Sequence, residues 1–244
     1  MDALLTAAAS GLRARTESLD LLANNIANAN TAGFKADREF YSTYLAPQSL
    51  DGPEGTLPVQ SPLVEKNWTD FQQGVTTATG SPLDVALSGP GFFTLDTGSG
   101  KVYTRNGNFR MQPDGHLTSG NGDPVLNTEG NAIRLDPKLA VTIEESGAIR
   151  QGGAFVARLA ITDFEDRSQL QKIGATVFRY DSSSPPPKTV NTKVEQGRLE
   201  NANFQPAESA VRLVNVMRQF EMLQKAIALG SEMNRRAIEE VAKL

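Results

Sequence analysis

The chain begins with the segment LTAAASGLRARTESLDLLANNI, residues 5–26, in which apolar side chains recur at steps of three and four residues. The same steps return near the other end of the chain, over residues 213–241. Side chains with this spacing share one helix face, and the sustained alternation is typical of a coiled coil. We therefore expect two long terminal helices that pack together and against other copies of the chain. The apolar seams comprise Leu5, Ala8, Leu12, Leu19, Leu22 and Ile26 at the start, and Leu213, Val216, Phe220, Leu223, Ile227, Ala237 and Val241 at the end.

Three residues interrupt these seams. Arg15 breaks the first seam, and Gly230 and Asn234 break the second. The sequence leaves two interpretations open for them: contacts with a neighbouring protein, or imperfections that the helices tolerate.

Composition excludes several classes of function. The net charge of -4 leaves no positive surplus for phosphates, so nucleic acid is not an expected partner. With no cysteine and one histidine, His116, we expect no metal, no cofactor and no small-molecule substrate. No apolar run reaches the ~20 residues of a membrane span. The first residues lack the pattern of a cleaved secretory signal, so export would need another route.

Between the two ends, the character of the sequence changes twice. Prolines and glycines punctuate residues 36–80 without a sustained period, which indicates an extended connector with one short helix near residues 37–44. Short segments rich in β-branched and aromatic residues follow and predict a mostly antiparallel β domain. The expected fold class is α+β. Its parts are a coiled-coil-like helical axial domain (1–35 and 203–244), the connector (36–80) and a β-rich outer domain (81–202).

Two turns are expected inside the β region. Asn106-Gly107 lies between two strand-like segments, and both residues accept the positive φ of a type I′ hairpin turn. Pro113-Asp-Gly115 predicts the next turn, because proline presets φ and glycine accepts a positive φ.

No group of residues has the spacing of a catalytic site. Asp114 and His116 would form a dyad, but a hydrolytic triad also needs a nucleophile, and an exposed turn histidine accounts for the pair. We therefore predict that the chain is not an enzyme. A hypothesis from another class stays open, in which the β region is a carbohydrate-binding or hydrolytic module and the helical ends serve only oligomerisation.

Four asparagines crowd the end of the first helical segment: Asn24, Asn25, Asn28 and Asn30. In one interpretation they let the helix end fray, because asparagine competes for backbone hydrogen bonds and tolerates left-handed geometry. In the other, they form hydrogen bonds between helices of neighbouring subunits, since Asn24 and Asn28 lie one turn apart.

The asparagine-rich stretch NNIANANTAGFK, residues 24–35, resembles the N-terminal signature of the rod and hook proteins of the bacterial flagellar basal body. The resemblance continues through four further stretches in the same order along the chain. These are SPLDVAL at 81–87 with GFF at 91–93, YTRNG at 103–107, GRLENAN at 197–203 and RQFEM at 218–222. Five separated matches make the resemblance specific at the level of the family.

This resemblance implies a structural subunit of the flagellar rod that self-assembles through its terminal helices and is needed for motility. It also implies export by the flagellar type III apparatus without a cleaved signal, and a place in the basal body where it crosses the periplasm. Its expected partners are copies of itself, other rod proteins and the export apparatus. The stretches at 81–86 and 220–222 resemble proximal rod members more than distal ones, and a distal rod or hook-type subunit is the alternative. The expected assembly interface consists of the two apolar seams with Asn24, Asn25, Asn28, Asn30, Gly33 and Phe34.

Overall fold

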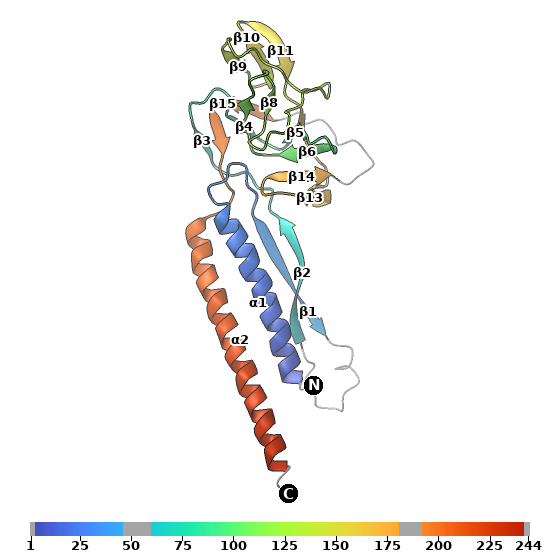
Figure 1. The fold of residues 1–244 in the computed structure, drawn as a ribbon, viewed down its shortest axis with the longest axis vertical. Coiled ribbons are helices and arrows are strands. Elements are labelled where there is room, and N and C mark those ends of the chain that lie inside the picture. Colours follow the sequence, from blue (N-terminus) through green and yellow to red (C-terminus); the bar gives the residue numbers. More distant parts are fainter. Residues whose placement is uncertain (1–2, 46–59, 181–191, 242–244) are drawn as a thin grey trace. The chain divides into compact units, whose positions relative to one another are not determined.

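The computed structural model describes residues 3–45, 60–180 and 192–241, and the chain divides into two compact units (Figure 1). The first, here called the helical unit, is formed by Met1–Ala27, Asp37–Trp68 and Gln205–Leu244. The second, the β unit, is formed by Asn28–Ala36 and Thr69–Phe204. Each unit thus combines segments from both halves of the chain.

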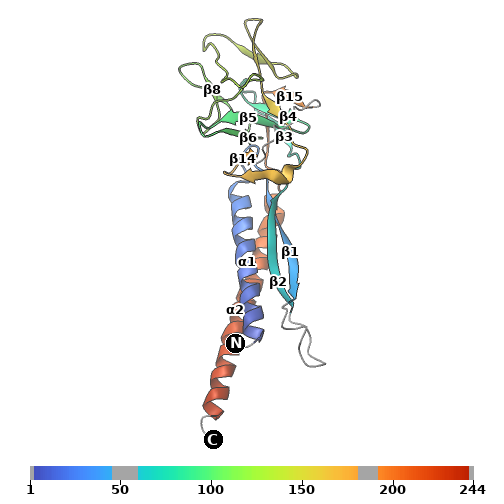
Figure 2. The ribbon, with the colours of Figure 1, turned by 90° about the vertical axis from the view of Figure 1, so that its right-hand side faces the viewer.

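The helical unit contains two helices and a two-stranded sheet. Helix α1 (Ala3–Ala27) and helix α2 (Pro206–Val241) lie side by side and run in opposite directions, as Figures 1 and 2 show. Strands β1 (Asp37–Leu45) and β2 (Gln60–Thr69) pair with each other, and β1 packs on α1. Alanine, leucine and arginine favour α1, and Pro206 occupies the first position of α2, where its missing N–H costs nothing.

The expectation of a coiled-coil-like domain made of the two terminal helices was wrong. A coiled coil needs an apolar heptad seam on both helices. In α1 the buried positions follow steps of three, three, four, four and three, and most carry small side chains: Ala8, Gly11, Ala14, Ser18, Leu22 and Asn25. The sheet β1–β2 also belongs to the same unit. The fold is α+β, with one helix from each end of the chain and a strand-rich middle.

The short helix expected near residues 37–44 was also wrong, because strand β1 occupies these residues. Their sequence, DREFYSTY, carries three aromatic residues and a threonine, which suit a strand once a partner is available. That partner is β2, which begins at Gln60.

The β unit is built from short strands, and its paired strands are antiparallel. Its largest sheet has the order β12-β5-β6-β14-β13, and a second has the order β11-β10-β9. The remaining pairs are β15-β4, β16-β3 and β7-β8. The strands are β3 (Thr76–Ala78), β4 (Val85–Ser88), β5 (Phe92–Asp96), β6 (Lys101–Thr104), β7 (Arg110–Met111), β8 (Leu117–Thr118), β9 (Val141–Ile143), β10 (Ala148–Gln151), β11 (Ala154–Arg158), β12 (Ile161–Thr162), β13 (Leu170–Lys172), β14 (Val177–Tyr180), β15 (Lys193–Gln196) and β16 (Arg198–Glu200), and the 3-10 helix η2 spans Arg167–Gln169.

Two apolar clusters hold the β unit together. The larger contains mostly aliphatic side chains from β4, β5, β6, β8, β9, β10, β11 and β15, together with Phe93 of β5 and loop residues such as Phe109. The smaller is aromatic, and its rings meet edge to face, an arrangement that adds to the burial of their area. Its members are Phe92, Tyr103, Phe164, Leu170 and Phe178, with Phe71 and Tyr180 packed against them.

The type I′ hairpin expected at Asn106-Gly107 is not formed. Strand β6 ends at Thr104 and pairs with β5 and β14, and Gly107 has no positive φ. Gly107 instead approaches the backbone of β4, where its carbonyl accepts the Val85 N–H at 3.0 Å. The turn expected at Pro113-Asp-Gly115 is confirmed: the Gly115 N–H donates to the Gln112 carbonyl at 2.9 Å.

Candidate assembly interface

Helix α2 presents a regular inward stripe to α1. Among its described side chains, those that are buried or half-buried follow steps of four and three residues. The isobutyl group of Leu223 lies 3.5 Å from the point where a Cβ on Gly11 of α1 would stand. The inner stripe consists of Ser209, Leu213, Val216, Phe220, Leu223, Ile227 and Gly230. It contains five residues of the expected second seam and Gly230, one of its breaks.

The buried residues of α1 are mostly small. Gly11 leaves room for Leu223 of α2. Ala14 is also buried, and the buried Ser18 hydroxyl donates to its carbonyl at 3.0 Å. Of the expected first seam, Ala8 and Leu22 are buried, whereas Leu12, Leu19 and Ile26 are half-buried, as is Arg15. The side chains of Leu5, Asn234, Ala237 and Val241 lie outside the described residues.

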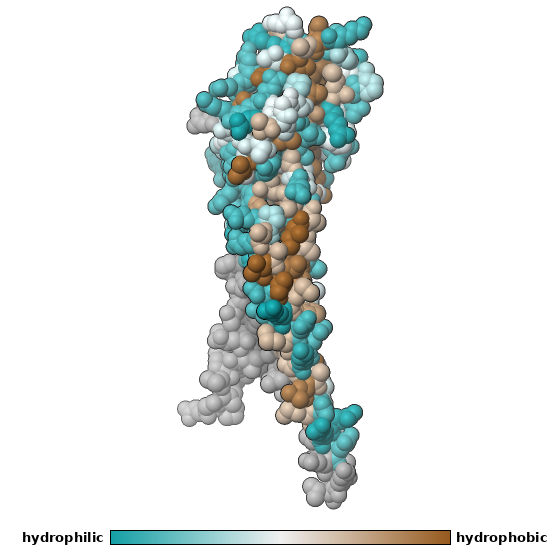
Figure 3. All heavy atoms as spheres, turned by 90° about the vertical axis from the view of Figure 1, so that its left-hand side faces the viewer, coloured by the Kyte–Doolittle hydropathy of each residue, from teal (hydrophilic) through white to brown (hydrophobic). Residues whose placement is uncertain are grey.

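The opposite face of α2 carries a second apolar stripe. Its five side chains have exposed fractions of 48 to 63%. At 100° per residue they cluster about 150° away from the inner stripe. Figure 3, which faces α2, shows hydrophobic residues along the exposed side of the helical unit. This outer stripe consists of Val211, Val214, Met222, Leu229 and Met233.

An ion pair connects α2 to the sheet of the same unit. Arg212 of α2 contacts the carboxylate of Glu39 in β1, whose side chain is 5% exposed. Arg212 is itself half in solvent, so this pair is worth less than a fully buried one. Its neighbours Val211 and Val214 remain exposed beside it.

The four asparagines do not form one group. Asn25 is buried and its amide is used inside the chain, since it donates to the Asp37 carbonyl at 2.9 Å and accepts the Asp37 N–H at 3.1 Å. It therefore satisfies the backbone of the first residue of β1. Asn28 is half-buried and its side-chain oxygen accepts the Thr31 hydroxyl, whereas Asn24 and Asn30 are exposed.

Gly33 and Phe34, also expected at the interface, are buried within the β unit. Gly33 has a φ of 69°, and its N–H donates to the Glu200 carbonyl at 2.7 Å. Phe34 has no exposed surface, and the Lys172 ammonium lies 4.3 Å from its ring centroid, within range of a cation–π interaction. These two residues hold the chain segment that follows α1.

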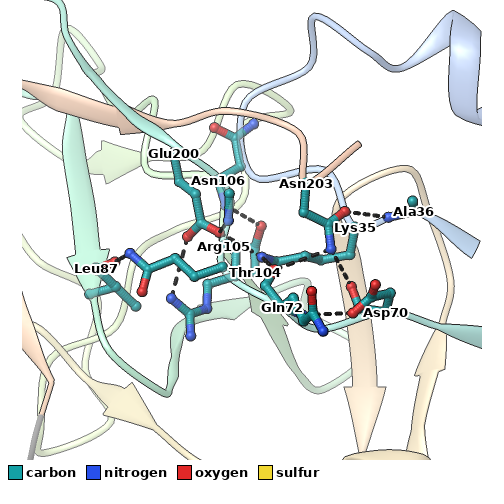
Figure 4. Close-up of polar contacts among 12 residues, drawn as sticks. Lys35, Ala36, Asp70, Gln72, Leu87, Thr104, Arg105, Asn106, Glu200 and Asn203 are labelled. Carbon is teal, nitrogen blue, oxygen red and sulfur yellow. Dashed lines mark hydrogen bonds and ion pairs between the residues drawn. The ribbon is translucent and has the colours of Figure 1, made fainter. Parts of the chain in front are cut away.

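Lys35, Arg105 and Glu200 form a buried cluster of charges (Figure 4). The Lys35 ammonium donates to Glu200 Oε1 and to the Gln72 carbonyl, each at 2.5 Å. Arg105 Nη1 donates to Glu200 Oε2 at 3.3 Å, and Arg105 Nη2 donates to the Gly89 carbonyl at 2.8 Å. The side chains of Lys35 and Glu200 are fully buried and that of Arg105 is 2% exposed.

Burial dominates the electrostatics of this cluster. It lowers the pKa of Lys35 below that of an exposed amine, and the charge of Glu200 offsets part of this shift. Burial likewise lowers the pKa of Arg105, against the same carboxylate. Glu200 is therefore the main counter-charge of both cations, ahead of Asp70 for Lys35 and Asp163 for Arg105.

The described residues contain little that resembles a reactive centre. Nowhere among them do three His, Asp or Glu side chains come together as a metal site. His116 Nδ1 lies 2.8 Å from Asp114 Oδ2 in an exposed turn, and hydrogen bonds from His116 lower the pKa of Asp114. Neither described helix is long and apolar enough to cross a membrane.

Known proteins resemble this chain over nearly its whole length. The flagellar basal-body rod protein FlgF of Caulobacter vibrioides is 35% identical over 93% of this chain and 92% of its own. The chain belongs to the flagellar basal-body rod protein family. FlgF of Mesorhizobium japonicum is 32% identical to this rod protein over 89% of the chain and 88% of its own. FlgG of Bacillus subtilis is 30% identical over 91% and 93%, respectively.

Three family models match separate parts of this rod protein. The flagella basal body rod protein model matches residues 5–35, and the C-terminal model of FlgEFG rod proteins matches residues 195–240. The D1 domain of the flagellar hook protein FlgE/F/G matches residues 86–151. The predictions of a rod and hook family member and of a structural rod subunit are confirmed. Membership places the protein in the flagellar basal body with other rod components.

The sequence patterns missed two features of this rod protein. The outer stripe carries steps of three, eight, seven and four residues, a second helical period that overlaps the second apolar seam in the same segment. Lys35, Arg105 and Glu200 carry charges that normally lie at the surface. The available signal was their position, because each lies inside one of the stretches that carry the family resemblance.

Proposed function

We propose that this rod subunit assembles through its helical unit and that neighbouring subunits cover the outer stripe of α2. The observation that carries the proposal is the exposure of five apolar side chains on the face of α2 that does not pack on α1. Burial of such side chains contributes roughly 1–2 kcal/mol each. In a single copy of the chain these side chains stay exposed to solvent, so this free energy is gained only on assembly.

In this proposal the expected apolar residues of α2 and its outer stripe, which was not expected from the sequence, have different roles. The inner stripe and the small residues of α1 stabilise the helix pair, and the outer stripe makes the contacts between subunits. Asn24 and Asn30 lie exposed at the end of the first helical region and are proposed as polar contacts of the same interface.

We further propose a FlgF-type subunit in the proximal part of the rod. The identity of 35% to a FlgF protein against 30% to a FlgG protein supports this choice. A distal rod or hook-type subunit is the alternative. The proposal includes export through the flagellar export apparatus without a cleaved signal, a position across the periplasm and contacts with further copies of the chain.

A charge on the outer stripe is expected to stop assembly without unfolding the protein. The double variant Met222→Glu and Leu229→Glu places two carboxylates where apolar contact is proposed, and both positions are exposed in the single chain. We expect an unchanged thermal unfolding temperature, loss of the chain from purified basal bodies and loss of swimming. Immunoblots of basal bodies and motility assays measure these results.

The matched control is Gln224→Glu, which adds charge at an exposed position of α2 about 140° from the outer stripe. It is expected to assemble and swim as the wild type does. Motile cells carrying the double variant would contradict the proposed interface. Turnover of peptidoglycan fragments by the purified protein would contradict the proposal that it has no enzymatic activity.

A further inference from the structure

Two segments that lie far apart in the sequence fold against each other in the β unit. Residues 28–36 lead out of α1, and residues 197–204 lead into α2. The Asn203 N–H donates to the Phe34 carbonyl at 3.4 Å, and the Asn203 side chain accepts the Ala36 N–H at 2.8 Å. The backbones are therefore joined at several points, in addition to the contact between Gly33 and Glu200.

The carboxylate of Glu200 connects these segments to two others. Its Oε1 accepts the Lys35 ammonium at 2.5 Å and the Gly74 N–H at 2.9 Å, and its Oε2 accepts Arg105 at 3.3 Å. Figure 4 shows Lys35 and Arg105 reaching this carboxylate from different parts of the unit. One side chain thus serves the segment after α1, the segment after β2 and the end of β6.

Glu200 is the carboxylate that binds both cations, and the charges of Asp70 and Asp163 have a smaller effect on the pKa values of Lys35 and Arg105, respectively. Lys35 bonds otherwise to the carbonyl of Gln72, and Arg105 bonds otherwise to the carbonyl of Gly89, both of which are uncharged. A buried cation that loses its bonded anion strongly destabilises the fold around it, and a buried lysine can also give up its proton. The conformation of residues 28–36 therefore depends on a carboxylate 165 residues further along the chain.

We infer that Glu200 is a latch that orders residues 28–36, so that this segment folds only when the C-terminal segment of the β unit has docked. The latch couples the ends of the β unit through charge rather than through apolar contact. Two segments in apolar contact can shift along each other by a residue and still pack. The buried carboxylate binds its donors only when the two segments are aligned in one register.

The latch has a consequence for assembly that rests on the function proposed above. In a chain exported unfolded with its N-terminus first, residues 28–36 would stay unfolded until Glu200 emerges. The latch itself is a property of the single chain and does not depend on export. Its test therefore uses purified full-length protein, and its failure would leave the proposed interface untouched.

The variant Glu200→Gln tests the latch with almost no change in volume. Glutamine places an N–H donor where one carboxylate oxygen accepts, so a donor faces a donor. We expect the amide of Gly74 to exchange hydrogen at least about tenfold faster, because it donates to the carboxylate and hydrogen bonds to charged groups are among the stronger ones. The amide of Gly33 donates to the backbone carbonyl of Glu200 and is expected to exchange faster to the same extent, because the segment that contains it is no longer ordered. Trypsin is expected to cut after Lys35, which is buried in the wild type. The amides of β5 and β6 are expected to keep their protection.

The matched control is Glu195→Gln, which neutralises a half-buried carboxylate of β15 paired with Arg198 at 3.1 Å. It is expected to exchange and to resist trypsin as the wild type does. Wild-type protection at Gly33 and Gly74 in Glu200→Gln would overturn the inference.

A second variant covers the case in which Glu200→Gln unfolds the whole unit. Lys35→Met removes one cation and leaves Glu200 bonded to Arg105 and Gly74. We expect faster exchange over residues 28–36 with protection retained in β5 and β6. Loss of protection throughout the β unit in both variants would overturn the inference, since the cluster would then be part of the general core.

Discussion

Gly107→Ala is expected to lower the stability of the β unit by about 4 kcal/mol or more, at the upper end of what single substitutions cost. A Cβ on Gly107 would stand 1.7 Å from the Val85 carbonyl oxygen and 3.1 Å from Cε2 of Phe93. The Val85 N–H donates to the Gly107 carbonyl, so the two backbones cannot separate without losing this bond. Urea unfolding of the full-length protein, followed by circular dichroism, measures the loss.

The matched control for this substitution is Gly120→Ala. A Cβ on Gly120 meets no atom within 4 Å, and the residue is exposed. The substitution is expected to change stability by less than about 0.5 kcal/mol, and loss of freedom in the unfolded chain favours a small gain. Equal midpoints for the two variants would show that Gly107 does not approach Val85 as closely as the structure has it.

Gly107 also shows where sequence patterns reach their limit. Asn-Gly is the strongest short signal for a hairpin, but it reports only what the local backbone can adopt. Here the glycine is required for a different reason, the passage of one backbone beside another 22 residues earlier in the chain. Pro113-Asp-Gly115 was predicted correctly because its turn is closed by residues inside the turn itself.

The sequence also predicted the buried face of α2 better than that of α1. The inner stripe of α2 follows the heptad spacing of the sequence, because its large apolar side chains are the ones that meet the partner helix. On α1 the partner helix approaches Gly11, where Leu223 lies, and the buried residues that follow on the same face of α1 include the small Ala14 and Ser18. A search for apolar periodicity selects Leu12 and Leu19, which lie half-buried beside that contact.

The buried charges were beyond sequence reasoning for a further reason. Lys35 and Glu200 are of the residue types least often buried, so their sequence alone places them at the surface. Their burial follows from mutual neutralisation across 165 residues, a pairing that no local pattern indicates. The family stretches marked these residues as noteworthy without showing their role.

Removal of residues 205–244 is expected to abolish assembly completely while the β unit still unfolds cooperatively. The deletion removes α2 with both of its stripes, and α1 then has no helix to pack on. All segments of the β unit remain, including Gly33 with its bond to Glu200. Basal bodies should lack the truncated chain and cells should not swim, whereas calorimetry of the purified protein should retain the transition of the β unit.

A deletion that begins only eight residues earlier is expected to behave differently. Removal of residues 197–244 also takes away β16, Glu200 and Asn203, and thereby the partner of β3 and the counter-charge of Lys35. The transition of the β unit should then move to a lower temperature, because β3 loses its partner strand and two buried cations and the backbone of residues 33–36 lose their partners. If the two truncated proteins melted alike, residues 197–204 would act as a tether for α2 and not as part of the β unit. The contrast between the two cuts therefore separates the residues that assemble the rod from those that fold its subunit.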